Sequence, residues 1–142
     1  MSHTAIVTGG TRGIGAAIST TLQQAGHKVA ATYAGNDEAA QRFHDESGIS
    51  VYKFDVADFE QCADAVSRIE SDLGPINILV NNAGITRDGT LHRMDFEQWN
   101  QVLQTDLSSC YNMCRNVIDG MRERGFGRIV NIGSVNGQAG QY

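Results

Sequence analysis

The chain has 142 residues, of which 41% are hydrophobic and 16 are glycine, with a single proline. This length and composition suit one globular domain with a substantial core and exclude a low-complexity chain. The net charge of -5, without a run of lysines and arginines, argues against a nucleic-acid surface, and no apolar run is long enough to cross a membrane.

Short β-type runs alternate with helical patterns along the whole chain. The predicted strands are 4–8, 28–33, 50–54, 77–80 and 128–132. Between them we predict helices over 13–25, over 36–47, from a cap at Asp58 to the stop at Gly74-Pro75, and over 95–121. The alternation is typical of a parallel sheet with helices on both faces. Right-handed crossovers then give an α/β, doubly wound, Rossmann-like sheet of order 3-2-1-4-5 in one domain, 1–142.

Apolar residues at helical spacing indicate which helix faces point inward. For the first helix the predicted stripe is Ile14, Ala17, Ile18, Thr21 and Leu22. For the second helix it is Ala39, Ala40 and Phe43, and for the third Cys62, Ala65, Val66, Ile69 and Leu73. The fourth carries a stripe that we interpret as core or subunit contact, formed by Phe96, Trp99, Val102 and Leu103.

The three cysteines are odd in number and lack Cys-x-x-Cys spacing, so we predict buried free thiols. Cys110 and Cys114 stand four residues apart on a predicted helix, but no further metal ligand accompanies them. The first residues run directly into a strand, which leaves no room for a secretory signal. We therefore expect a cytoplasmic protein without a metal.

A glycine-rich turn, Thr8-Gly9-Gly10-Thr11-Arg12-Gly13-Ile14-Gly15, joins the first predicted strand to the first helix. Gly9 permits a sharp turn, Gly13 lets the backbone approach a diphosphate, and Gly15 lets the helix pack closely. The helix N-terminus offers unpaired N–H groups and the positive end of its dipole to an anion. We therefore predict a nucleotide-binding site at this turn.

Other polar motifs follow the remaining strands at the same sheet edge. Asp55-Val56 follows the third strand, Asn81-Asn82-Ala83-Gly84 the fourth, and Ser134 the fifth. Parallel strands all end at one edge, and ligands of such sheets bind there, where the strand order reverses. We expect these loops to meet the glycine-rich turn.

Thr8-Gly9-x-x-x-Gly13-x-Gly15 together with Asn81-Asn82-Ala83-Gly84 resembles the short-chain dehydrogenase/reductase family. Segments 81–88, 117–121, 127–132 and 134–138 are similar to its acetoacetyl-CoA reductases of polyhydroxyalkanoate (polyhydroxybutyrate) synthesis and its 3-oxoacyl-acyl-carrier-protein reductases. The resemblance implies an oxidoreductase that reduces a 3-oxoacyl thioester of coenzyme A with a nicotinamide cofactor. It also implies a homo-oligomer, usually a tetramer.

The resemblance carries roles onto individual residues. Ser134 matches the catalytic serine that holds the substrate oxygen, although a serine at a strand end also satisfies local backbone. Asp106 stands at the family's catalytic asparagine, where its charge needs a cation or water, or impairs proton relay. The implied cofactor-binding residues are Gly9, Thr11, Arg12, Gly13, Ile14, Gly15, Tyr33, Asp55, Val56, Asn81, Ala83 and Gly84. Those on the substrate side are Asn136, Gln138 and Gln141.

The choice of cofactor depends on the residues at the end of the second strand and in the glycine-rich turn. Tyr33 stands where enzymes that use NAD carry an acid, and Arg12 can reach a 2′-phosphate. We predict NADPH, the alternative being that Arg12 is a solvated loop cation. Asp55 is expected to accept the exocyclic amine of adenine and Val56 to cover its ring. Asn81 either lines the adenosine or holds the central strand.

The end of the sequence departs from the family pattern. Tyr142 stands eight residues after Ser134, a shorter gap than in the family, and no tyrosine is followed by lysine four positions later. We therefore do not assign Tyr142 as the proton donor. We expect a chain that lacks the family's last strands and is inactive alone. The alternative is a non-catalytic fragment that binds nucleotide or associates with itself.

Overall fold

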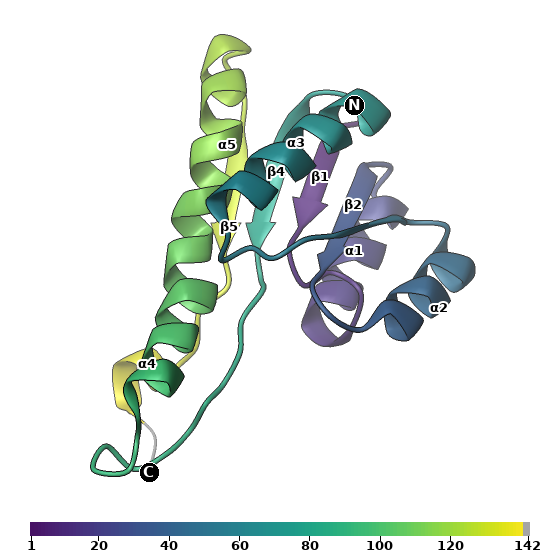
Figure 1. Cartoon of the computed structure of the whole chain (residues 1–142). Helices are drawn as coiled ribbons and strands as arrows, with labels where there is room; N and C mark the ends of the chain where they lie inside the picture. Colours follow the sequence, from purple (N-terminus) through teal and green to yellow (C-terminus); the bar gives the residue numbers. More distant parts are fainter. Residues whose placement is uncertain (141–142) are drawn as a thin grey trace.

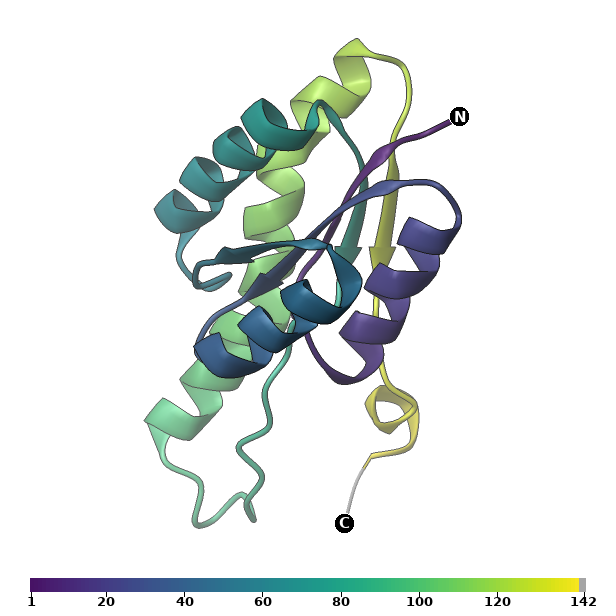
Figure 2. The ribbon, with the colours of Figure 1, turned by 90° about the vertical axis from the view of Figure 1, so that its right-hand side faces the viewer.

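The computed structural model describes residues 1–140. In it the chain forms a five-stranded parallel sheet between two helical layers (Figures 1 and 2). The strands are β1 (Thr4–Val7), β2 (Lys28–Tyr33), β3 (Ser50–Lys53), β4 (Ile76–Asn81) and β5 (Arg128–Asn131). Their order is β3-β2-β1-β4-β5. The predicted fold class and strand order are confirmed, and no strand end differs from its predicted position by more than one residue.

Two helices cover each face of the sheet. Helices α1 (Gly13–Gln24) and α2 (Asp37–Ser47) lie on one face, and α3 (Phe59–Leu73) and α5 (Ser109–Glu123) on the other (Figures 1 and 2). A short α6 (Asn136–Ala139), which was not predicted, follows β5. Among residues 1–140 no helix combines the length and the apolarity needed to span a bilayer.

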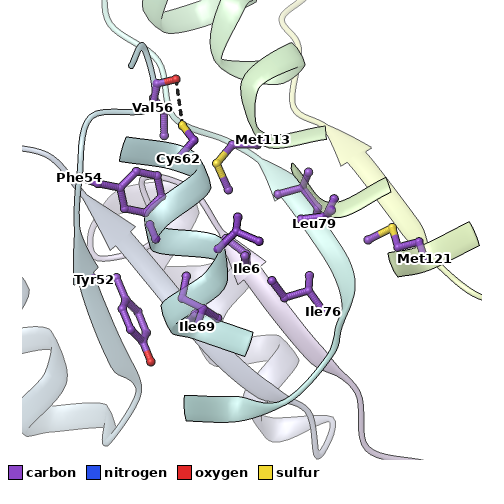
Figure 3. Close-up of a cluster of buried hydrophobic side chains, with 14 residues drawn as sticks. Ile6, Tyr52, Phe54, Val56, Cys62, Ile69, Ile76, Leu79, Met113 and Met121 are labelled. Carbon is purple, nitrogen blue, oxygen red and sulfur yellow. Dashed lines mark hydrogen bonds between the residues drawn. The ribbon is translucent and has the colours of Figure 1, made fainter. Parts of the chain in front are cut away.

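The larger core lies between the sheet and the pair α3 and α5. Ile6 and Leu79 from the sheet meet Ile69 of α3 and Met113 of α5, all without exposed surface (Figure 3). The predicted inward faces of α2 and α3 are confirmed, since each predicted residue is buried or half-buried. Of the three thiols, all free, Cys62 is buried, whereas Cys110 and Cys114 are half-buried rather than buried as predicted.

The predicted inward face of α1 is partly wrong. Ile14, Ala17 and Thr21 are exposed, whereas Gly15 and Ser19 are buried. The reason is the close approach of the helix to the glycine-rich turn, where the Ser19 hydroxyl donates to the Gly10 carbonyl oxygen at 3.0 Å. Large side chains do not fit this contact, so the helix is rotated relative to its apolar stripe.

The predicted long helix is divided in three. Helix α4 (Phe96–Val102) leads into a π-helical segment, η1 (Leu103–Ser108), and then into α5. Phe96 and Trp99 are 77% and 53% exposed, so the core interpretation is wrong for both. Figure 1 shows the reason, because α4 extends past the carboxyl edge of the sheet and has no strand beneath it.

Gly15 sets the distance between α1 and the rest of the carboxyl edge. A Cβ atom at this position would clash with the Gly9 carbonyl oxygen and would lie 2.6 Å from Asn82 Nδ2. Gly137 offers a contrast, because a Cβ there would meet no described atom within 4 Å and its φ is not positive. The φ of Gly15 is not positive, so its backbone conformation is open to other residues. Glycine is required there because a side chain has no space.

Gly15→Ala is expected to destabilise the fold by about 1–3 kcal/mol, because the methyl group forces α1 away from the turn. Urea unfolding followed by circular dichroism measures this change. Gly137→Ala is the matched control and should leave the midpoint within about 0.5 kcal/mol of the parent. Equal midpoints for the parent and Gly15→Ala would show that α1 is not packed as described.

Candidate functional site

The loops that follow the strands gather at the carboxyl edge of the sheet, the lower edge in Figure 1. The parallel register brings the ends of β1, β2 and β4 together, with Val7 opposite both Ala31 and Val80. The glycine-rich turn, the Asp55-Val56 loop, the Asn81–Gly84 segment and Ser134 all follow strands at this edge, as expected from the sequence.

A buried hydroxyl joins the glycine-rich turn to the loop after β4. Thr8 is 2% exposed, and its Oγ1 accepts hydrogen bonds from the backbone N–H groups of Asn82 at 3.0 Å and Ala83 at 2.9 Å. In return, Asn82 Nδ2 donates to the carbonyl oxygens of Thr8 and Gly9, at 3.0 and 3.2 Å. The two loops therefore form one cross-linked unit. Sequence reasoning assigned Asn82 no role, although its place directly after a buried strand was a usable signal.

The open end of this unit has the chemistry of an anion cradle. No side chain caps the N-terminus of α1, and its first turn carries no acid. Gly13 has a φ of +54°, and a Cβ there would meet no described atom within 4 Å, so backbone is accessible at this point. Arg12 is exposed and forms no ion pair within residues 1–140. Uncapped N–H groups beside a free guanidinium fit a dinucleotide diphosphate.

The remaining predicted residues of this turn differ in exposure. Ile14 is 68% exposed, whereas Thr11 is buried. The side chain of Ile14 is therefore open to a ligand, and that of Thr11 has little surface to offer.

At the end of β2, the Tyr33 phenol lies beside a carboxylate whose negative charge is balanced by a lysine. Burial, followed by a hydrogen bond to Asp37, raises the pKa of Tyr33 above its usual value. Asp37 also accepts from Lys53 Nζ at 2.9 Å in an exposed ion pair, which lowers the pKa of Asp37. The carboxylate that interacts with Tyr33 therefore already has a cationic partner.

The loop after β3 places its two predicted residues differently. Asp55 is exposed, and its Oδ1 accepts the N–H of Ala57 at 2.9 Å. The Val56 side chain is 6% exposed and packs in the core, as Figure 3 shows. The carboxylate of Asp55 is thus open to a ligand, whereas the side chain of Val56 is largely covered by protein.

The side chain of Asn81 is engaged within the protein. Its Nδ2 donates to Asn131 Oδ1 at 2.9 Å, which ties β4 to β5, and contacts Cys114 Sγ at 3.5 Å. This geometry matches the structural alternative for Asn81. Of the other predicted cofactor-binding residues in this loop, Ala83 is half-buried and Gly84 is exposed.

Asp106 lies in the π-helical segment and reaches the loop after β4. Its Oδ1 accepts the backbone N–H of Ile85 at 2.8 Å. No cation within residues 1–140 forms an ion pair with it. Asp106 is exposed, so solvent and this N–H accommodate its charge.

Ser134, the predicted catalytic serine, is also exposed. Ser134 Oγ accepts the backbone N–H of Asn136 at 3.2 Å, which leaves its own hydroxyl proton available. Asn136 and Gln138 are exposed on α6. Gln141 and Tyr142 lie outside the described residues.

Two hollows lie at opposite edges of the sheet. A pocket of about 280 Å³ borders Asp106 and lies between the 85–88 loop and the helical residues Trp99 and Leu103. A larger hollow of about 730 Å³ lies beside the N-terminal ends of the strands, next to Thr4 and Lys28, and none of the predicted site residues lines it. Of these two, the smaller pocket is therefore the one that a predicted site residue, Asp106, lines.

Comparisons with known proteins agree with this arrangement. A family model described as short chain dehydrogenase matches residues 3–142. The chain is 60% identical to an acetoacetyl-CoA reductase of Rhizobium meliloti and 56% identical to one of Paracoccus denitrificans, over 99% and 97% of its length. It is 41% identical, over 96% of its length, to the 3-oxoacyl-[acyl-carrier-protein] reductase FabG of Escherichia coli.

The chain spans between 56% and 58% of the length of these three relatives. The family match nevertheless covers nearly every residue, including the glycine-rich turn and the loops after β3, β4 and β5. By its sequence and its fold, the chain belongs to the short-chain dehydrogenase/reductase family.

Proposed function

We propose that residues 1–142 form a dinucleotide-binding Rossmann domain, and that the whole protein reduces a 3-oxoacyl thioester, acetoacetyl-CoA, to the 3-hydroxyacyl thioester with NADPH. The observation that carries the proposal is the uncapped N-terminus of α1, held beside the loop after β4 by Thr8 and Asn82. The acetoacetyl-CoA reductases among the relatives support the substrate class.

The bound nicotinamide would supply hydride, and the residues of this chain would orient the reactants. The glycine-rich turn would hold the diphosphate through backbone N–H groups. Ser134 would donate its hydroxyl proton to the substrate carbonyl oxygen, where negative charge develops. Its bond from the Asn136 N–H leaves that proton free for this role.

Three features of the cradle support NADPH over NADH. The exposed Arg12 side chain forms no ion pair within residues 1–140 and can bind a 2′-phosphate in a charge-assisted contact. Tyr33 ends β2 where an acid would favour the ribose of NAD. Asp37, which interacts with Tyr33, is paired with Lys53, so its charge repels a phosphate less.

We also propose that the protein is a cytoplasmic homo-oligomer. Three free thiols favour a reducing compartment. An apolar surface along α4, η1 and α5, which we call the outer stripe, is more than half exposed and consists of Phe96, Trp99, Leu107 and Tyr111. Large apolar side chains exposed along one helical run favour a contact site, and a second copy of the chain would cover them.

A second candidate function is nucleotide binding without turnover. Within residues 1–142 no tyrosine is followed by lysine four residues later, the pair that the resemblance implies for proton donation, so these residues by themselves are proposed to bind and not to donate the proton. The cradle does not depend on that pair, so cofactor would still bind.

The first experiment mixes the full-length protein with acetoacetyl-CoA and NADPH and follows the absorbance of the reduced nicotinamide. The proposal predicts turnover that saturates with both substrates. Saturable NADPH binding without turnover at any pH would favour the second candidate. Absence of both binding and turnover would reject both functions.

Arg12→Ala is expected to raise KM for NADPH about tenfold or more, because a charge-assisted phosphate contact is lost, and to change KM for NADH little. Steady-state kinetics with each cofactor measure the difference. Arg122→Ala, an exposed arginine near the end of α5, is the control and should change neither value. Equal effects of Arg12→Ala on both cofactors would exclude the phosphate contact.

Trp99→Glu is expected to reduce the sedimentation coefficient of the full-length protein, since a charge in the outer stripe opposes self-association. Leu91→Glu is the control, because Leu91 is 84% exposed and lies outside the stripe. A parent protein that sediments as a monomer would refute the oligomer proposal.

A further inference from the structure

A side chain from α5 holds the loop that follows β3. Asn112 is 6% exposed, and its Nδ2 donates to the carbonyl oxygen of Val56 at 2.9 Å. These residues are 56 positions apart in the sequence. A buried amide needs a hydrogen-bond partner, and this one finds it in the loop that carries Asp55, the expected adenine contact.

The other bonds that fix the same loop come from nearby in the sequence, three of them from side chains as follows. Gln61 Oε1 accepts the N–H of Asp55 at 3.0 Å, and Asp55 Oδ1 accepts the N–H of Ala57. The Cys62 thiol contacts the Val56 carbonyl oxygen at 3.5 Å, the dashed line in Figure 3. Burial, with the nearby charges of Asp58 and Asp55, raises the pKa of this thiol to about 12, so it stays protonated at neutral pH. Of these four bonds, only that of Asn112 connects the loop to a distant helix.

The same helical run also holds the loop after β4. Asp106, six residues before Asn112, accepts the N–H of Ile85 from within η1. The run η1 and α5 thus contacts both loops, one on the expected adenine side and one beside the Asp106 pocket. A shift of this helical run would therefore change the positions of both loops.

We propose that Asn112 is a positioning residue for the adenosine half of the cofactor. Its bond to Val56 would keep the 55–57 loop in the conformation that presents the Asp55 carboxylate at the sheet edge. Loss of the bond would weaken cofactor binding through the adenosine alone and would leave the hydride step unchanged. This inference rests on the proposed NADPH-binding function.

The test compares Asn112→Leu with the parent in the full-length protein. Leucine is close in volume and removes the donor, so Val56 loses its bond to α5. Asn116→Leu is the matched control, because Asn116 Nδ2 donates at 2.8 Å to the Asn112 carbonyl oxygen within α5 and not to the loop. Thermal unfolding verifies that each variant is folded.

Three ligands separate the halves of the cofactor: NADPH, 2′,5′-ADP and reduced nicotinamide mononucleotide. Asn112→Leu is expected to raise Kd about five- to tenfold for NADPH and for 2′,5′-ADP, with Kd for the mononucleotide and kcat at saturating NADPH unchanged. Asn116→Leu should change none of these values. Calorimetric titration and steady-state kinetics provide the measurements.

Equal weakening of both half-ligands by Asn112→Leu would mean a general structural role and would overturn the inference. Unchanged affinity for every ligand would overturn it as well, without touching the proposed function. A parent protein that binds no NADPH would overturn both. If Asn112→Leu does not fold, Asn112→Ala, which removes the donor without burying a charge, carries the same expectations.

Discussion

Two backbone N–H groups of the loop after β4 converge on one buried hydroxyl, that of Thr8. Because both N–H groups and the Asn82 amide are satisfied by the first crossover, β1 and β4 continue as one unit past the sheet edge. This interaction holds the glycine-rich turn in place while leaving the first N–H groups of α1 without a capping side chain. The candidate anion cradle exists because these polar groups are paired with each other and not with the end of the helix.

The helices contribute to the site through close contacts as well as through the core. Gly15 and Ser19 bring α1 against the turn, and Asn112 brings α5 against the loop after β3. On the face of the sheet that α3 and α5 cover, the large apolar residues of these helices form the core. The polar contacts determine where each loop lies. The close contacts therefore set the geometry of the site, and some of them, such as that of Gly15, also contribute to stability.

The sequence predicted the sheet order and the loops of the site because alternating patterns, glycine spacing and strand ends are local signals. It failed where tertiary contacts decide. Ile14 fits an apolar stripe, yet it is exposed because the neighbouring Gly15 makes the close contact. The π-helical turn at Asp106 leaves no mark in the hydrophobic pattern, and the distant bond from Asn112 to Val56 is visible only in three dimensions. Phe96 and Trp99 have core-like spacing on a helix with no strand beneath it.

The central claim is that backbone N–H groups of the glycine-rich turn and of α1 bind a dinucleotide diphosphate. Backbone amide chemical shifts of the isotopically labelled full-length protein, followed during titration with NADP⁺, test it residue by residue. The account predicts saturable shifts at Gly13, Ile14 and Gly15, with smaller ones at Asn82 and Ala83 through Thr8. Saturable binding that leaves the amides of residues 9–15 unmoved, or no binding at all, would contradict it.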